Sequence, residues 1–225
     1  MDKSPKNKDE VLRYLGYKNQ NLDKITNDLI EESMDEMRNL IKPRYIYKFF
    51  NIMRKEEKIY LNSSNFNLVG KDIENHLDKS EICTLIAVTL GNDVDAKIRY
   101  YEKINMTKAL ILDACATAAI EEICDKICEE LENILNVENK TLTSRYSPGY
   151  GDLPINIQKR FLSMLDAEKA IGLTASSHSI LIPRKSVTAI VGVVDRKDKI
   201  KKISCLNCSK YYTCMFRKGD EKFGH

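Results

Sequence analysis

The stretch Ile82-Cys83-Thr84-Leu85-Ile86-Ala87-Val88-Thr89-Leu90 is almost wholly apolar and is followed by Gly91. A short apolar run that ends at a glycine is typical of a strand buried on both faces. We therefore expect residues 82–90 to form a strand near the centre of a sheet.

Two helices are expected after this strand, and the second extends from about Met106 to Leu135. Apolar residues recur along it at every third or fourth position and would form one inward stripe. The stripe comprises Ile111, Cys115, Ala119, Ile123, Ile127, Leu131 and Ile134. Small residues at 114–119 would allow close approach of another backbone or of a bulky ligand, and tight packing against the sheet is the preferred interpretation.

The flanking segments alternate between helix and strand patterns. Upstream, the spacing predicts a helix over 22–41 that Pro43 closes, a strand over 45–50, strand edges at 58–61 and 68–70, and a short helix over 71–77. Downstream, it predicts a helix over 155–165 and strands at 180–183 and 187–193. Because no βαβ rhythm or internal repeat is present, the chain is expected to be an α+β protein.

Composition limits the class of protein. The 225 residues are 43% hydrophobic and 31% charged, with a formal net charge of +3. No apolar run is long enough to cross a membrane and the N-terminus is charged, so we expect a soluble, cytoplasmic protein. Cysteines within apolar segments favour a reducing compartment. The small net charge disfavours nucleic-acid binding.

The segment from Thr143 to Pro154 concentrates side chains suited to a ligand. Arg145 can hold a carboxylate through paired hydrogen bonds, and Pro148-Gly149 forces a turn whose backbone can approach a ligand closely. Tyr150 adds an aromatic face that would attract a sulfonium cation. On these residues alone, an ordinary surface turn is the simpler interpretation.

The same segment resembles the activation domain of cobalamin-dependent methionine synthase, whose signature for binding S-adenosylmethionine is Arg-x-x-x-Gly-Tyr. Here that signature is Arg145-Tyr146-Ser147-Pro148-Gly149-Tyr150. The resemblance extends over most of residues 10–195. It includes Leu112-Asp113-Ala114 with Ala118-Ala119-Ile120-Glu121, Leu165-Asp166-Ala167-Glu168-Lys169, and Leu173-Thr174 followed by Pro183 and Ser186-Val187.

The resemblance implies a twisted, mainly antiparallel sheet with long helices over residues 1–203. It implies that Arg145 grips the methionine carboxylate, that Gly149 permits close backbone approach and that Tyr150 packs on the ligand. Ser147 and Pro148 complete the turn, and Glu138 is an approximate counterpart of an acidic residue of the family.

The resemblance also implies partners. The chain has no Asp-x-His-x-x-Gly corrinoid motif. It would therefore act in trans, reactivating cob(II)alamin on a separate methionine synthase or other corrinoid protein with a flavodoxin-like or ferredoxin-like electron donor.

Residues 204–225 form a basic tail with Cys205, Cys208 and Cys214. Three thiolates could bind zinc or an iron–sulfur cluster if a fourth ligand were supplied, and redox-active or unligated cysteines are the other interpretation. If the tail binds metal, the chain could instead be a non-catalytic adaptor or regulator of a corrinoid protein. Cys124 and Cys128 are expected to pack in the core, and His178 to be a hydrogen-bonded loop residue.

Overall fold

The fold is built on one antiparallel sheet. The computed structural model describes residues 8–17, 20–55, 58–61 and 64–198. Six strands pair in the order β3-β2-β1-β4-β8-β5, all antiparallel. They are β1 (Arg44–Lys55), β2 (Lys58–Leu61), β3 (Asn67–Leu68), β4 (Ile82–Thr89), β5 (Lys140–Leu142) and β8 (Ser186–Asp195). The predicted α+β class with a mainly antiparallel sheet is confirmed.

Strand β4 lies inside the sheet, as its apolar sequence predicted. It pairs with β1 on one side and β8 on the other, so that Ile86 lies opposite both Tyr47 and Ala189. Residues alternate between the two faces of a strand. Accordingly Leu85 lies in one hydrophobic core and Val88 in the other. The sheet is therefore covered by a separate layer on each face.

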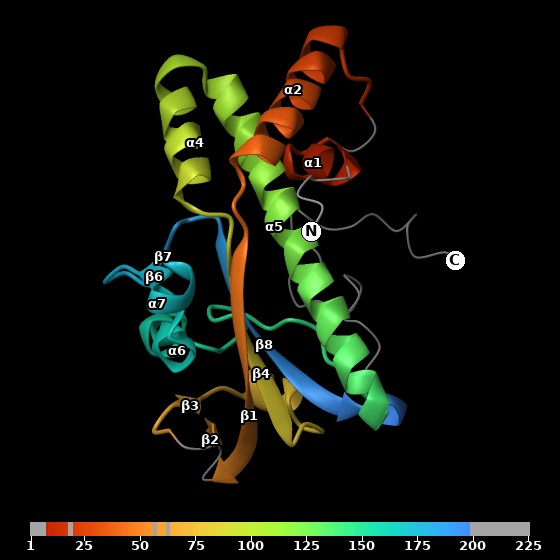
Figure 1. Cartoon of the computed structure of the whole chain (residues 1–225), viewed down its shortest axis with the longest axis vertical. Helices are drawn as coiled ribbons and strands as arrows, with labels where there is room; N and C mark the ends of the chain where they lie inside the picture. The colour runs from red at the N-terminus through yellow and green to blue at the C-terminus, as the bar shows by residue number, and fades with distance from the viewer. Residues whose placement is uncertain (1–7, 18–19, 56–57, 62–63, 199–225) are drawn as a thin grey trace.

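One layer is helical and contains α1 (Lys8–Tyr14), α2 (Lys24–Leu40), α4 (Asn92–Ile104) and α5 (Met106–Leu135). The long helix α5 runs beside the sheet, with the other three gathered around its first half (Figure 1). Its bounds match the prediction, and its stripe is buried except for Ile134, which is 58% exposed. Ile134 lies in the last turn of α5, beyond Leu131, the last buried residue of the stripe. Ile25 of α2 is likewise 81% exposed, because it is rotated away from the face that buries Ile30.

The opposite layer is made of shorter pieces. It contains α3 (Lys71–His76), α6 (Gln158–Leu165), α7 (Ala167–Ile171) and a small hairpin of β6 (Thr174–Ala175) and β7 (Leu181–Ile182). Figure 1 shows α6, α7 and the hairpin on the side of the sheet away from α5. The predicted helix over 155–165 is a short 3-10 turn (Ile155–Ile157) followed by α6. The sequence did not predict α1, α7 or β5.

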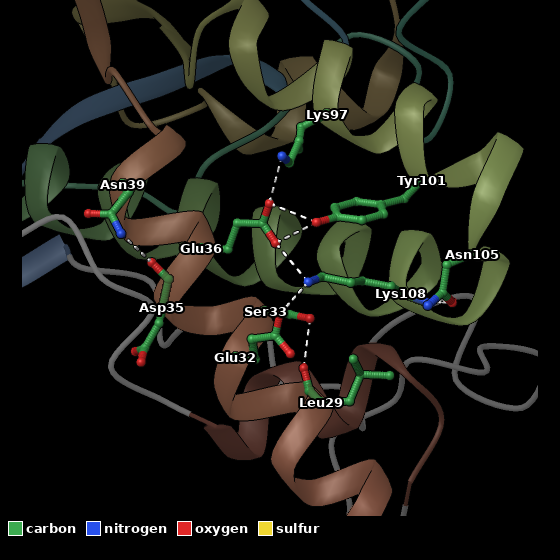
Figure 2. Close-up of polar contacts among 10 residues, drawn as sticks. All are labelled: Leu29, Glu32, Ser33, Asp35, Glu36, Asn39, Lys97, Tyr101, Asn105 and Lys108. Atoms are coloured by element: carbon green, nitrogen blue, oxygen red, sulfur yellow. Dashed lines mark hydrogen bonds and ion pairs between the residues drawn. The ribbon is translucent and has the colours of Figure 1, made fainter.

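A network of charges ties the helical layer together (Figure 2). The carboxylate of Glu36 on α2 accepts the Tyr101 hydroxyl at 3.0 and 3.1 Å, and pairs with the Nζ atoms of Lys97 and Lys108, each 3.1 Å away. Lys108 also contacts Glu32 at 2.6 Å. Because its partners belong to α4 and α5, Glu36 fixes α2 against both helices.

Within the described ranges, no helix is both long enough and apolar enough to cross a bilayer. Helix α5 has the length, but charged residues such as Glu121 and Asp125 interrupt it.

Candidate functional site

The loop after β5 is fastened to the edge of the sheet. Its Thr143 N–H donates to the Gly192 carbonyl at 2.9 Å, and the Thr143 hydroxyl accepts the Gly192 N–H at 2.8 Å. Three residues farther on, Tyr146 exchanges two backbone hydrogen bonds with Ile190, 2.9 and 2.8 Å long. The loop thus continues the pairing of β5 with β8 beyond the end of β5. Arg145 is held between these two anchors.

Arg145 forms two ion pairs with α5. One terminal nitrogen lies 2.6 Å from Oδ1 of Asp125 and the other lies 2.7 Å from Oε2 of Glu121. The arginine side chain is only 21% exposed. Burial alone would lower the pKa of Arg145, but the nearby Cys124 thiol and the carboxylates of Asp125 and Glu121 outweigh it and raise the pKa above its usual range. The guanidinium is therefore permanently charged and already oriented.

The signature turn follows directly. Pro148 is buried, and the backbone closes through Tyr150 N–H to the Ser147 carbonyl at 3.0 Å and Gly149 N–H to the Leu153 carbonyl at 2.9 Å. Gly149 has a φ of 92°, a backbone conformation that residues with a Cβ atom rarely adopt. The sequence requirement for glycine at this position is therefore conformational.

Tyr150 lies at the exposed edge of the turn. Its ring packs edge-on against Tyr146, with centroids 5.9 Å apart. Although the residue as a whole is 57% exposed, its hydroxyl end is crowded enough that burial raises the pKa of Tyr150. Glu121 raises that pKa further and Arg145 lowers it, so the phenol is within electrostatic reach of both. Arg145 and Tyr150 therefore lie on one loop, close enough to influence each other electrostatically.

Among the predicted site residues, Arg145, Ser147, Pro148, Gly149 and Tyr150 form this one loop, whereas Glu138 lies elsewhere. Glu138 ends a 3-10 turn after α5, where its 67% exposed side chain pairs with Lys140 at 3.2 Å. It lies beyond the end of α5, whose last residue, Leu135, is already about 15 Å from Asp125 along the helix axis. The acidic groups beside Arg145 are instead Glu121 and Asp125, which the sequence reasoning did not assign. Glu121 ends a segment that resembles the family, and Asp125 follows it by one helical turn. This spacing could have identified the two carboxylates as candidates from the sequence.

Tyr150 is exposed at the surface, whereas the Arg145 side chain beside Glu121 is mostly buried. Two of the hollows in the described part of the chain, of about 340 and 180 Å³, are lined by α6, α7 and β6 and by α4, α5 and residues 184–185. Neither is lined by the 143–154 loop. A ligand packed on the Tyr150 ring would have one side in solvent, because that residue is 57% exposed.

The cysteine predictions have separate outcomes. Cys205, Cys208 and Cys214 lie outside the described residues. Within those residues, no group of three or more His, Cys, Asp or Glu side chains could hold a metal ion. Cys124 is buried in the core, as predicted, and burial raises the pKa of its thiol to about 12. Cys128 is partly buried against the same core.

His178 lies exposed between β6 and β7, with its N–H donating to the Ser176 hydroxyl oxygen at 3.2 Å. The interpretation of His178 as a hydrogen-bonded loop residue is confirmed.

Comparison with known proteins identifies the fold. No family model matches the chain, and no curated protein sequence matches it. The structure is similar to the crystal structure of the MetH reactivation domain bound to AdoHcy, with a TM-score of 0.58 and 17% sequence identity. The match covers 80% of this chain and 66% of that chain, so this chain spans just under two thirds of its length. The chain has the fold of that reactivation domain.

Proposed function

We propose that this chain binds S-adenosylmethionine on the surface bordered by Arg145 and Tyr150, and presents it to a separate cobalamin-dependent methionine synthase. There it would support reductive methylation of cob(II)alamin. The observation that carries the proposal is the joining of Arg145, Gly149 and Tyr150 in one anchored turn. This turn belongs to a fold shared with a domain whose crystal structure contains AdoHcy.

The residues around the turn fit the chemistry of this ligand. An arginine carries five N–H donors, more than its contacts with Glu121 and Asp125 require, so Arg145 can also donate hydrogen bonds to the ligand carboxylate. Glu121 and Asp125 can receive the ligand ammonium group. The Tyr150 ring offers a face to the sulfonium. The ligand would thus find partners for each of its charged groups within one turn of the loop and one turn of α5.

The role assigned to the chain is positioning. The methyl donor and the corrinoid of the partner supply the chemistry, and a flavodoxin-like or ferredoxin-like protein supplies the electron. Holding the donor at an open surface lets a second protein approach it, which removes part of the entropic barrier to their encounter. The exposed position of Tyr150 suits this task, because a ligand packed on its ring would stay accessible to a partner.

Calorimetric titration with S-adenosylmethionine tests the binding step. The parent protein should bind, and Arg145→Ala should bind roughly 10- to 100-fold more weakly, because a charged hydrogen-bonding partner of the carboxylate is lost. Arg38→Ala is the matched control, since Arg38 forms an exposed ion pair with Asp35 on α2. Absence of binding by the parent, or equal binding by Arg145→Ala, contradicts the proposal.

A second experiment tests the partner. A methionine synthase without its own activation domain is prepared with its cofactor in the cob(II)alamin state. It is then mixed with the chain, S-adenosylmethionine and reduced flavodoxin. Formation of methylcobalamin, followed by its absorbance, should require every component. If the chain binds the ligand but methylcobalamin does not form, action in trans on this partner is wrong while the binding site stands.

A further inference from the structure

Tyr146 occupies the centre of the site without being one of the fixed residues of the signature. Its backbone pairs with Ile190 of β8. Its ring lies between two other rings, with centroids 5.0 Å from His76 and 5.9 Å from Tyr150. Its hydroxyl donates to the carbonyl oxygen of Tyr150 at 3.1 Å. One residue thus joins the rigid sheet to the turn that carries Gly149 and Tyr150.

The turn is also fastened from its other end. The carboxylate of Asp152 accepts the N–H groups of Lys71 and Asp72, at 2.6 and 3.2 Å, in the first turn of α3. Between these two attachments lies Gly151, where an added Cβ would collide with the Tyr146 hydroxyl and the Asp72 carboxylate. The space behind the turn is therefore filled, and the Tyr146 hydroxyl is wedged against the backbone.

A turn with glycine at 149 and 151 needs this support. Glycine has access to more backbone conformations than other residues, so a turn that contains two of them is costly to order on binding. Both have a positive φ, 92° and 49°. A hydrogen bond from a ring that is itself fixed by β8 and His76 selects one of these conformations before a ligand arrives.

We propose that Tyr146 is a positioning residue for ligand binding: its hydroxyl holds the Tyr150 carbonyl so that the Tyr150 ring and Arg145 face one ligand. This inference rests on the proposed function. Tyr146 acts through Tyr150 and does not itself touch the ligand. Its hydroxyl therefore contributes to affinity largely through the placement of the Tyr150 ring, because the carbonyl that it holds belongs to the same residue.

Tyr146→Phe removes the hydroxyl and keeps the ring. S-adenosylmethionine should bind this variant roughly fivefold to tenfold more weakly, the value of one net hydrogen bond. Tyr45→Phe is the matched control, because it removes a hydroxyl that donates to Glu130 at 3.3 Å, outside the loop. It should bind as the parent does. Equal affinity of Tyr146→Phe and the parent overturns the inference.

A double-mutant cycle tests the route of the effect. In a Tyr150→Ala background the ring that Tyr146 positions is absent, so adding Tyr146→Phe should cost less affinity than it does in the parent. A full additional loss would show that Tyr146 acts by another route and would overturn the inference. Gly151→Ala gives a second perturbation with Tyr146 intact, since its Cβ displaces the hydroxyl. It should weaken binding in the same direction, and unchanged binding would contradict the role.

Amide hydrogen exchange gives a measurement without ligand. In Tyr146→Phe the amides of Gly149, Tyr150 and Leu153 should exchange faster, while those of β4 and β8 keep the parental rate. Unchanged exchange in the turn overturns the holding role even if affinity falls. If the parent protein does not bind S-adenosylmethionine, both the proposed function and the role of Tyr146 in ligand binding are wrong. If the parent binds and Tyr146→Phe has the same affinity, only this inference is wrong.

Discussion

The Nε2 atom of His76 lies 3.0 Å from the hydroxyl oxygen of Thr143, and the same ring packs against Tyr146. Burial lowers the pKa of His76 below its usual 6.5, although a hydrogen bond with the backbone of Ser144 partly opposes it. A histidine at the end of α3 therefore supports the loop in its neutral form.

The stability of the protein should depend on pH through His76. Between the lowered folded pKa and about 6.5, the unfolded chain binds more protons than the folded one, so stability falls as the pH falls through this window. Above it, the contribution of His76 is constant. Unfolding midpoints between pH 5 and 8 should therefore vary less in His76→Gln than in the parent. His178→Gln, in the exposed turn, should keep the parental profile, and identical profiles for the parent and His76→Gln would disprove the assignment.

Two glycines should differ in how they respond to alanine. A Cβ on Gly192 would collide with the Ser80 hydroxyl and lie 3.0 Å from a Leu77 methyl carbon, so Gly192→Ala should lower the free energy of unfolding by about 1–3 kcal/mol through overpacking. At Gly149 the nearest atom would be 3.5 Å away, and the cost should be about 1 kcal/mol from its positive φ alone.

Chemical denaturation measures both changes. Gly16→Ala is the control for Gly149, because it also has a positive φ but no atom within 4 Å. A cost at Gly192 no larger than at Gly16 would contradict the steric account.

Glu36 should contribute more to the free energy of unfolding than its neighbour Asp35. Partial burial would raise the pKa of Glu36, but hydrogen bonds from Lys97, Lys108 and Tyr101 outweigh it and lower the pKa below 4.5. This stabilisation is complete above about 4.5 and is lost as the pH falls through the lower folded value. Glu36→Gln should cost about 1–3 kcal/mol at neutral pH, because Lys108 loses a partner while largely buried.

Asp35→Asn is the matched control for this network. It breaks an ion pair with Arg38 in which both side chains are 45% or more exposed, and such pairs contribute about 0–1 kcal/mol. Urea unfolding compares the two variants. If Asp35→Asn were as destabilising as Glu36→Gln, the network in Figure 2 would not be what fixes α2.

The core thiols should resist alkylation in the folded protein. Burial raises the pKa of Cys83, Cys115 and Cys124 to about 12. At neutral pH the reagent therefore cannot reach these sulfur atoms, and the reactive thiolate form is scarce. Mass spectrometry after iodoacetamide treatment should find these three unmodified until denaturant is added. Modification of Cys124 at the rate of a free thiol would show that this part of α5 opens.

The sequence predicted the long and apolar elements of the fold well. Helix α5 and strand β4 have strong periodic or continuous apolar signals, and their bounds were close to those observed. Strand β5 has three residues and exists because β8 offers it partners, information that no local pattern carries. Helix α7 is separated from α6 only by Asp166 with a φ of 55°, a break that helix periodicity does not reveal.

The site was only partly predictable for a similar reason. Arg145, Gly149 and Tyr150 lie within six residues of sequence, so one motif indicated them together as candidate site residues. Asp125 is 20 residues from its arginine partner, and His76 is 67 residues from Thr143. Their proximity depends on how α5 and α3 pack on the sheet. Glu138 was assigned from its separation from Arg145 in the sequence. The chain leaves α5 and reverses direction between these two residues, so their separation in sequence does not predict their separation in space.

The charges of Arg145, Glu121 and Asp125 also contribute to the electrostatic potential that an approaching ligand experiences. One guanidinium faces two carboxylates, so the group carries one excess negative charge. S-adenosylmethionine has one more positive charge than S-adenosylhomocysteine, its demethylated product. If S-adenosylmethionine is the ligand, as proposed, it should associate faster than S-adenosylhomocysteine, and added salt should narrow the difference between their association rates.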